Sequence, residues 1–73
     1  MGKYHIDVFY SEEDEGFIAN IPDLEYCSAF GETPEVALKE VIVAQNLWLE
    51  VAKENGTKIP EPLYKPMYLK AAQ

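Results

Sequence analysis

The sequence contains no arginine, one cysteine and one histidine among its 73 residues. Proteins that bind nucleic-acid phosphates depend on several Lys and Arg contacts, so we expect no direct nucleic-acid partner. A lone cysteine, Cys27, cannot form an internal disulfide. No stretch approaches the roughly 20 apolar residues of a membrane-spanning helix, and the start MGKYHID lacks the apolar run of a signal peptide. These absences predict a cytoplasmic protein that does not engage membranes.

Acidic residues are abundant and unevenly placed. Residues 1–36 hold nine acids and one lysine, a net charge of −8, whereas residues 37–73 hold four acids and five lysines, a net charge of +1. Four acids are consecutive: Glu12, Glu13, Asp14 and Glu15. Calcium and zinc sites space their ligands in patterns that this run does not follow. We interpret it as the solvated tip of a hairpin and expect no metal and no cofactor.

Alternating apolar and polar residues predict three antiparallel strands. Residues 4–10 and 17–21 alternate as half-buried strands do, and residues 25–30 follow as a third strand, with Cys27 and Ala29 on one face. Gly16 is expected to supply a permissive backbone at the exit of the first turn. Matching apolar residues across the first two strands predicts these pairs: Tyr10 with Phe17, Val8 with Ala19, Ile6 with Ile21, Asp7 with Asn20, and Phe9 with Ile18.

A long helix is predicted from Pro34 to about Asn55. Thr33 is expected as its N-cap and Gly56 as a left-handed C-terminal cap. The helix face expected to pack on the sheet comprises Ala37, Val41, Ala44, Trp48, Val51 and Ala52, flanked by Leu38, Ile42 and Leu49. A second apolar line, Val36, Val43 and Leu47, points elsewhere. Two interpretations of that line stay open: scattered surface residues, or a seam for self-association.

These elements predict an α+β fold of order β-β-β-α, a three-stranded antiparallel sheet packed on one long helix, in a single domain over residues 1–73. A chain this short buries only about 60% of its unfolded surface, so the core is thin and oligomers are expected. Residues 63–73 should leave the helix as an extended tail. Residues 63–69 could instead add a fourth strand at a sheet edge, or reach across to a partner.

Candidate catalytic groups are few. A nucleophile needs a base and an orienting group, and the chain offers His5, Asp7 and Cys27. A dyad of His5 and Cys27 stays open, but a histidine at the rim and a small buried thiol form the simpler interpretation. Asp7 would serve a metal-dependent nuclease only with further carboxylates from other strands. We therefore predict that the protein is not an enzyme.

Short motifs follow one another in a recognisable order between residues 4 and 62. They are Gly16-Phe17, Ile21-Pro22-Asp23-Leu24, Cys27, Gly31-Glu32-Thr33, Ala37-Leu38, Trp48-Leu49, Gly56 and Ile59-Pro60-Glu61-Pro62. In this order they resemble the N-terminal domain of the HicB-like antitoxin family. The resemblance implies a partial ribonuclease-H-like fold without its catalytic acids. It also implies a homodimer or larger oligomer that neutralises a small basic RNA-cleaving toxin of the HicA type.

Two features depart from that family. The glycine that precedes the cysteine in the family is replaced by Tyr26, so the local backbone need not be the same. Larger members also carry a C-terminal DNA-binding domain of helix-turn-helix or ribbon-helix-helix type, which the 11 residues after Pro62 cannot supply. Binding to an operator by this chain alone is therefore not expected.

The leading hypothesis is a non-enzymatic module that offers an acidic surface to a small basic toxin. The candidate residues for that contact are Glu12, Glu13, Asp14 and Glu15, with Phe9 and Ile18 beside them. Val36, Val43 and Leu47 are the candidates for self-association. The alternative is a stand-alone oligomeric scaffold or ligand-binding protein without a toxin partner.

Overall fold

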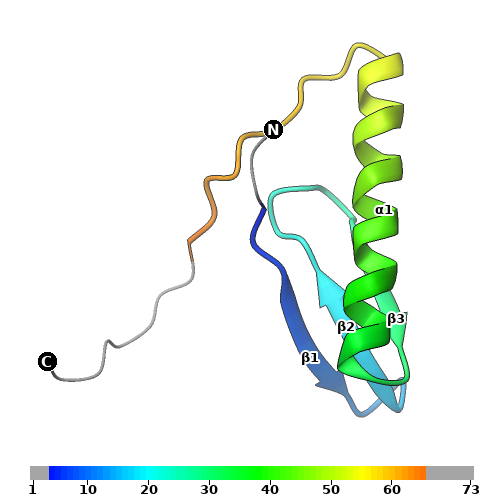
Figure 1. Cartoon of the computed structure of the whole chain (residues 1–73). Coiled ribbons are helices and arrows are strands. Elements are labelled where there is room, and N and C mark those ends of the chain that lie inside the picture. Colours follow the sequence, from blue (N-terminus) through cyan, green and yellow to red (C-terminus); the bar gives the residue numbers. More distant parts are fainter. Residues whose placement is uncertain (1–3, 66–73) are drawn as a thin grey trace, which may run out of the picture.

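The computed structural model describes residues 4–65, which form three strands and then one helix. Their bounds are β1 (Asp7–Ser11), β2 (Gly16–Asn20), β3 (Ser28–Gly31) and α1 (Pro34–Glu54). The strands make one antiparallel sheet in the order β1-β2-β3, and α1 lies across one of its faces (Figure 1). The predicted α+β fold, a three-stranded sheet with one long helix, is confirmed. No helix in residues 4–65 combines the length and apolar character needed to cross a membrane.

The register between β1 and β2 is the predicted one. Four expected pairs are present: Tyr10 with Phe17, Val8 with Ala19, Asp7 with Asn20, and Phe9 with Ile18. The rings of Tyr10 and Phe17 meet edge to face, with their centroids 5.3 Å apart. The fifth expected pair, Ile6 with Ile21, lies beyond the paired residues of the two strands. Both side chains nevertheless belong to the apolar interior, because Ile21 is fully buried and Ile6 packs against the core.

The first turn corrects the role predicted for Gly16. The residue with a positive φ in this turn is its neighbour Glu15, at 54°. Gly16 is buried, and a Cβ atom at this position would overlap the ring of Phe30 on β3. Position 16 therefore leaves room for the aromatic ring of another strand, and it is Glu15 that makes the left-handed turn.

The third strand begins later than predicted. Extended structure was expected from Glu25, but β3 starts at Ser28. Tyr26 has a φ of 61°, a left-handed conformation that a strand cannot contain. The preceding residues instead close a loop, in which the N–H of Ile21 donates to the carbonyl of Cys27 at 3.0 Å. Tyr26 stands where the HicB-like family that the sequence resembles has glycine. Its backbone has the left-handed conformation that glycine adopts most readily.

The same loop is attached to the helix. The indole N–H of Trp48 donates to the carbonyl of Glu25 at 2.9 Å. The side chain of Leu24 is almost fully buried in the core, so the loop contributes to the interior as well as connecting β2 to β3. The hydrogen bond to Glu25 and the burial of Leu24 therefore fix the two residues that precede Tyr26, the residue with the positive φ.

Both predicted caps of α1 are confirmed. Thr33 is extended, with φ −129° and ψ 160°, and its hydroxyl accepts from the N–H of Val36 at 3.1 Å. At the other end Gly56 has a φ of 71°. The N–H of Thr57 donates to the carbonyl of Ala52 at 2.8 Å, which is the long bond of a Schellman motif. Local chemistry thus sets the length of the helix.

The core between α1 and the sheet is small. Its buried side chains are Ala19, Ile21, Leu24, Cys27, Ala37 and Val41. Ala44, Trp48 and Leu49 pack against it, as expected for the central face of the helix. Val51 was expected on that face and is exposed. It lies one turn after Leu47 and so shares the outward side of the helix, which corrects its assignment.

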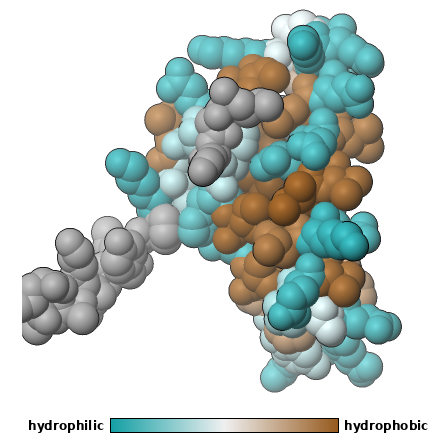
Figure 2. Space-filling view, viewed as in Figure 1, coloured by the Kyte–Doolittle hydropathy of each residue, from teal (hydrophilic) through white to brown (hydrophobic). Residues whose placement is uncertain are grey.

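The helix leaves part of the sheet uncovered. It packs mainly over β3 and β2, and the helix-facing side chains of β1, Val8 and Tyr10, are exposed. Leu38 and Ile42, expected to flank the packed face, are exposed as well. Figure 2 shows hydrophobic side chains gathered on the viewed face of the molecule, with hydrophilic ones around them. One helix therefore does not bury all the apolar surface of this fold.

After α1 the chain turns back towards the N-terminal segment (Figure 1). The hydroxyl of Tyr4 donates to the carbonyl of Pro60. Residues 57–65 contain no strand, so up to Lys65 the suggested fourth strand is not formed. The remainder of that suggestion, residues 66–69, lies outside the described residues.

Replacing Tyr26 by glycine should stabilise the protein. The left-handed conformation costs an L-residue roughly 1–2 kcal/mol, and glycine avoids this cost. The greater entropy of glycine in the unfolded chain offsets part of the gain, so we expect the free energy of unfolding to rise by about 0.5–1 kcal/mol. Tyr26 is 94% exposed, so little packing is lost. Urea unfolding measures the change. The control is Glu25→Gly, at an exposed neighbour without a positive φ, which should destabilise; a fall in stability for Tyr26→Gly would contradict the assignment.

Candidate functional site

The acidic residues of the first hairpin lie in its turn and are exposed. Glu12, Glu13, Asp14 and Glu15 join β1 to β2. The hydroxyl of Ser11 donates to Oδ2 of Asp14 at 2.9 Å, which fixes the start of the turn. Within residues 4–65, no group of three or more His, Cys, Asp and Glu side chains is arranged to hold a metal ion. What the turn presents is a concentrated negative charge at one end of the sheet.

An apolar row crosses the sheet on the face opposite α1. Phe9 of β1 lies opposite Ile18 of β2, and Ile18 lies opposite Phe30 of β3. Phe9 is 51% exposed and Phe30 45% exposed, with Ile18 half-buried between them. The row lies two residues, or about 7 Å, from the pair Ser11 and Gly16 that opens the acidic turn. We call these three side chains the outer row.

Sequence reasoning placed Phe9 and Ile18 on this face but missed Phe30. A signal was present, because Cys27 and Ala29 were assigned to one face of the third strand, and Phe30 must then point to the other. The missing information was the register between β2 and β3, which sets Phe30 beside Ile18. The outer row thus spans all three strands.

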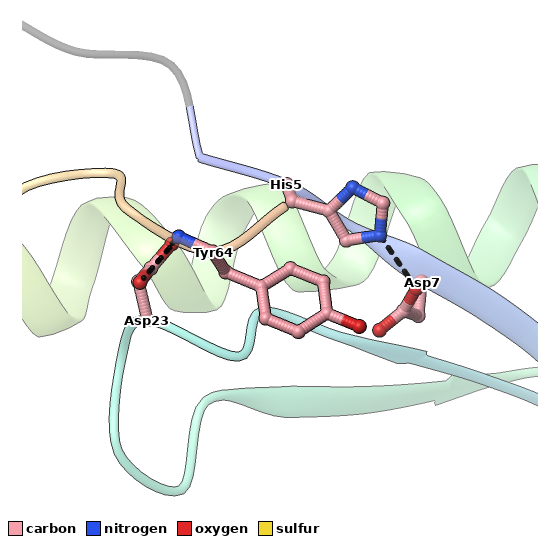
Figure 3. Close-up of polar contacts among 4 residues, drawn as sticks. All are labelled: His5, Asp7, Asp23 and Tyr64. Carbon is pink, nitrogen blue, oxygen red and sulfur yellow. Dashed lines mark hydrogen bonds and ion pairs between the residues drawn. The ribbon is translucent and has the colours of Figure 1, made fainter. Parts of the chain in front are cut away.

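A polar cluster lies on the same face, near the start of β1 (Figure 3). The Nε2–H of His5 donates to Oδ1 of Asp7 at 2.6 Å. The ring of His5 is 5.0 Å from the ring of Tyr64, between centroids. Side chains 5, 7 and 9 alternate on one side of the chain, so this cluster continues the face that carries Phe9. In Figure 3 the helix runs behind the sheet, and Tyr64 lies in front of it.

Further contacts hold the returning chain in this place. The N–H of Tyr64 donates to both carboxylate oxygens of Asp23, each at 3.2 Å. Burial, and secondly the charge of Asp23, raise the pKa of the Tyr4 hydroxyl, which stays protonated and donates to Pro60. The segment after the helix is thus attached to the N-terminal residues and to the loop before β3.

The suggested dyad of His5 and Cys27 is not formed. Cys27 is buried in the core with Ala37 and Val41, on the helix side of the sheet, whereas His5 lies on the opposite face with Asp7. Burial raises the pKa of the Cys27 thiol, which keeps the thiol protonated and unreactive. Of the three candidate groups, the structure brings together only His5 and Asp7.

The second apolar line of α1 is exposed, as its separate direction predicted. Val43 is 60% exposed and Leu47 is 59% exposed, and Val36 is exposed two helical turns before Val43. Val51 extends the line by one further turn. Its use for self-association stays a prediction.

One open hollow of about 680 Å³ lies beside the second half of α1. Its lining residues are Asn46, Leu49, Glu50, Lys53 and Ile59. The ionisable groups Glu50 and Lys53 are exposed at its rim. The hollow shares no residue with the acidic turn or the outer row, so we treat it as separate from the candidate site.

Comparison with known proteins finds one informative likeness. The chain is 43% identical over 53 residues to a UPF0150 protein of Synechocystis sp. (strain ATCC 27184 / PCC 6803 / Kazusa), and the aligned part covers 73% of each chain. No protein-family model matches the sequence. No solved structure matches it either.

The buried thiol predicts a loss of stability in alkaline solution. Because the pKa of Cys27 is raised in the folded protein, the unfolded chain releases its thiol proton first as the pH climbs past about 8.5. This contribution to stability is complete below that pH and declines above it. Urea midpoints between pH 7 and 9.5 should fall more steeply for the unsubstituted protein than for Cys27→Ala. Equal slopes would show that the thiol does not cause the decline.

Proposed function

The chain belongs to the UPF0150 family, and we propose that it is a non-enzymatic, HicB-like antitoxin-type module that neutralises a small basic RNA-cleaving toxin. The observation that carries this proposal is the outer row beside the acidic turn. Exposed aromatic rings with charged groups at their border are the usual anatomy of a protein-binding surface. The site is therefore suited to a partner that is basic around an apolar centre.

The charge of the chain supports a basic partner. The net charge is −7, and nine of the 13 acids lie in residues 1–36, which include all three strands. The sheet face that carries the outer row is called the outer face. Complementary fields speed the encounter of two proteins and orient them before contact. A toxin that cleaves RNA needs a cationic surface for its substrate, and an acidic module that covers this surface would block the substrate. Since such a toxin acts on messenger RNA, we expect the complex in the cytoplasm.

Self-association is the second part of the proposal. The described residues bury a small core, and Val36, Val43 and Leu47 remain exposed along one side of α1. Burying apolar surface contributes about 25 cal/mol per Å², so pairing these lines in a homodimer or larger oligomer would add stability that the thin core lacks. This seam lies on the helix, away from the outer row. An oligomer could therefore form and still bind its partner.

A second candidate function rests on the same helix line. If the exposed line is the main interface of the molecule, the protein is a stand-alone oligomeric scaffold or ligand-binding protein without a toxin. The two functions differ in the use of the outer face. The scaffold needs only the helix, whereas the antitoxin needs the acidic turn and the outer row as well.

Removing the charges of the turn should weaken binding of a purified HicA-type toxin. For Glu12→Gln, Glu13→Gln, Asp14→Asn and Glu15→Gln combined, we expect the association rate at low salt to fall by about tenfold. The difference should shrink as salt screens the charges, since the Debye length drops from about 30 Å at 0.01 M to about 8 Å at 0.15 M. Stopped-flow binding at several salt concentrations measures both effects.

The matched control removes four exposed acids of α1: Glu35, Glu40, Glu50 and Glu54. It makes the net charge of −7 less negative by the same four units but leaves the turn intact. The control should keep most of the association rate. Equal losses in the two variants would show that only net charge matters, and undiminished toxin activity with the unsubstituted protein would refute the antitoxin function.

Leu47→Glu should shift the protein towards monomer. A carboxylate in the middle of the helix line is costly to bury unless an opposite charge or a hydrogen-bond donor pairs with it, so the contact between subunits is lost. Sedimentation equilibrium over a range of concentrations measures the mass. Asn46→Glu adds the same charge at the adjacent exposed position and should leave the mass unchanged. An unaltered mass for Leu47→Glu would assign Val36, Val43 and Leu47 to ordinary surface.

A further inference from the structure

An exposed apolar line on α1 borders the open hollow beside the second half of this helix. We call it the helix line, and it consists of Val36, Val43 and Leu47. At about 100° per residue, Glu50 and Lys53 of the hollow lie next to the helix line, on one flank of the helix. Leu49 and Ile59 give the hollow its apolar lining. The helix line and the hollow therefore form one continuous surface.

The charged side chains on this flank of α1 alternate in sign. In sequence order they are Glu35, Lys39, Glu50 and Lys53, and all four are exposed. At about 100° per residue, each lies within about 80° of Val43, in the same direction around the helix. The one ion pair in residues 4–65 joins His5 to Asp7, so none of the four charges is paired within the described part of the chain. A helix that runs in the opposite direction presents a base wherever this one presents an acid.

A second copy of the chain, placed antiparallel, therefore complements the series. α1 has 21 residues, and its middle residue is Ala44. With Ala44 at the two-fold axis, residue 35 lies opposite residue 53, and residue 39 lies opposite residue 49, next to Glu50. This symmetry keeps both charged flanks on the same side of the contact. We propose that α1 docks in this antiparallel arrangement on α1 of a second copy, with Glu35 paired to Lys53 and Lys39 paired to Glu50.

The same arrangement brings the two helix lines together. Val43 lies next to its own copy near the two-fold axis, and Leu47 packs beside Val43 of the second copy. Val36 lies opposite the last turns of the second helix, beside Val51, which is 45% exposed. The axes of packed helices are about 8–10 Å apart, close enough for these side chains to interdigitate. The antiparallel pair thus buries the helix line over its whole length.

The hollow accommodates a lysine of the second copy. Lys39 faces position 49 of the other helix and so lies over the hollow, whose lining includes Leu49 and Ile59. A lysine side chain lays its methylene groups along apolar surface and keeps its ammonium group in a polar setting. The exposed carboxylate at this rim is that of Glu50, the acid that the antiparallel pair assigns to Lys39. The shape of the hollow and the charges therefore favour the same contact.

A parallel pair of helices fits this surface less well. It would place the two charged flanks on opposite sides of the contact and leave Glu35 and Glu50 without a cation. In the antiparallel pair the helix dipoles are opposed, and Glu54 faces residue 34 of the second copy, at the positive end of that dipole. The orientation is therefore set by the charges, and the apolar line supplies the contact area.

Charge reversal across the contact tests the arrangement. Lys39→Glu and Glu50→Lys each create two like-charged pairs in a homodimer, so we expect the dissociation constant of either variant to rise about tenfold. In an equimolar mixture the heterodimer regains both attractive pairs, and its dissociation constant should return to within about threefold of the original. Sedimentation equilibrium measures the constants, and differently tagged chains identify the heterodimer. Reversal is used because removal of a charge would leave the apolar line to hold the pair.

The matched controls are Lys58→Glu and Glu61→Lys. Both positions are exposed beyond the end of α1, and the substitutions change the net charge by the same amounts. Neither control should alter the dissociation constant, and their mixture should bind no more tightly than each alone. Circular dichroism verifies that the helix is intact in every variant.

The arrangement rests on the self-association that belongs to the proposed function, and the two fail in different ways. If Leu47→Glu lowers the mass but the two reversals do not weaken the dimer, self-association stands and the antiparallel arrangement is wrong. A mixture that binds no more tightly than either reversed variant alone would also overturn the arrangement. An unsubstituted protein that is monomeric at every concentration would overturn the self-association and the arrangement together.

Discussion

One helix must cover a three-stranded sheet, and the width of the helix limits what this protein can bury. An α-helix with its side chains is about 10–12 Å across, whereas α1 packs mainly over β3 and β2 and leaves β1 at its margin. Several apolar side chains therefore remain exposed on both faces of the sheet and along the helix. These uncovered apolar surfaces are the candidate interfaces of the molecule, and they exist because the single helix cannot bury them.

Non-local polar contacts compensate for the thin interior. Trp48 donates to the loop before β3, Tyr64 donates to Asp23, and Tyr4 donates to Pro60. Each joins segments far apart in the sequence, and each fixes a stretch that has no strand or helix of its own. The loop tolerates a left-handed Tyr26 because its ends are hydrogen-bonded and Leu24 is buried in the core.

The sequence predicted what local rules determine. Alternation and apolar matching were sufficient for the register of β1 and β2, and the chemistry of Thr33, Pro34 and Gly56 was sufficient for the ends of α1. The loop before β3 was predicted wrongly as a strand, because two non-local hydrogen bonds determine its backbone. One joins Ile21 to Cys27, and the other joins Trp48 to Glu25. Local propensity does not contain that information.

The candidate site divides in the same way. The acidic turn and the pair of Phe9 and Ile18 followed from one hairpin and were predicted. Phe30 required the register of a second strand pair, and the role of Gly16 required knowledge that the Phe30 ring lies beside it. The position of Tyr64 depends on contacts 41 and 59 residues away in the sequence, which no window of the sequence reveals.

The central claim is that the outer face, with its apolar row and acidic turn, is where a basic protein binds. Amide hydrogen exchange tests it most directly, measured on the chain alone and in complex with a small basic protein purified with it from its native cells. The account predicts added protection in β1, β2 and β3 and in the turn between β1 and β2, with little change on the outward side of α1. Protection confined to α1, or the absence of any basic protein in the purified material, would contradict it.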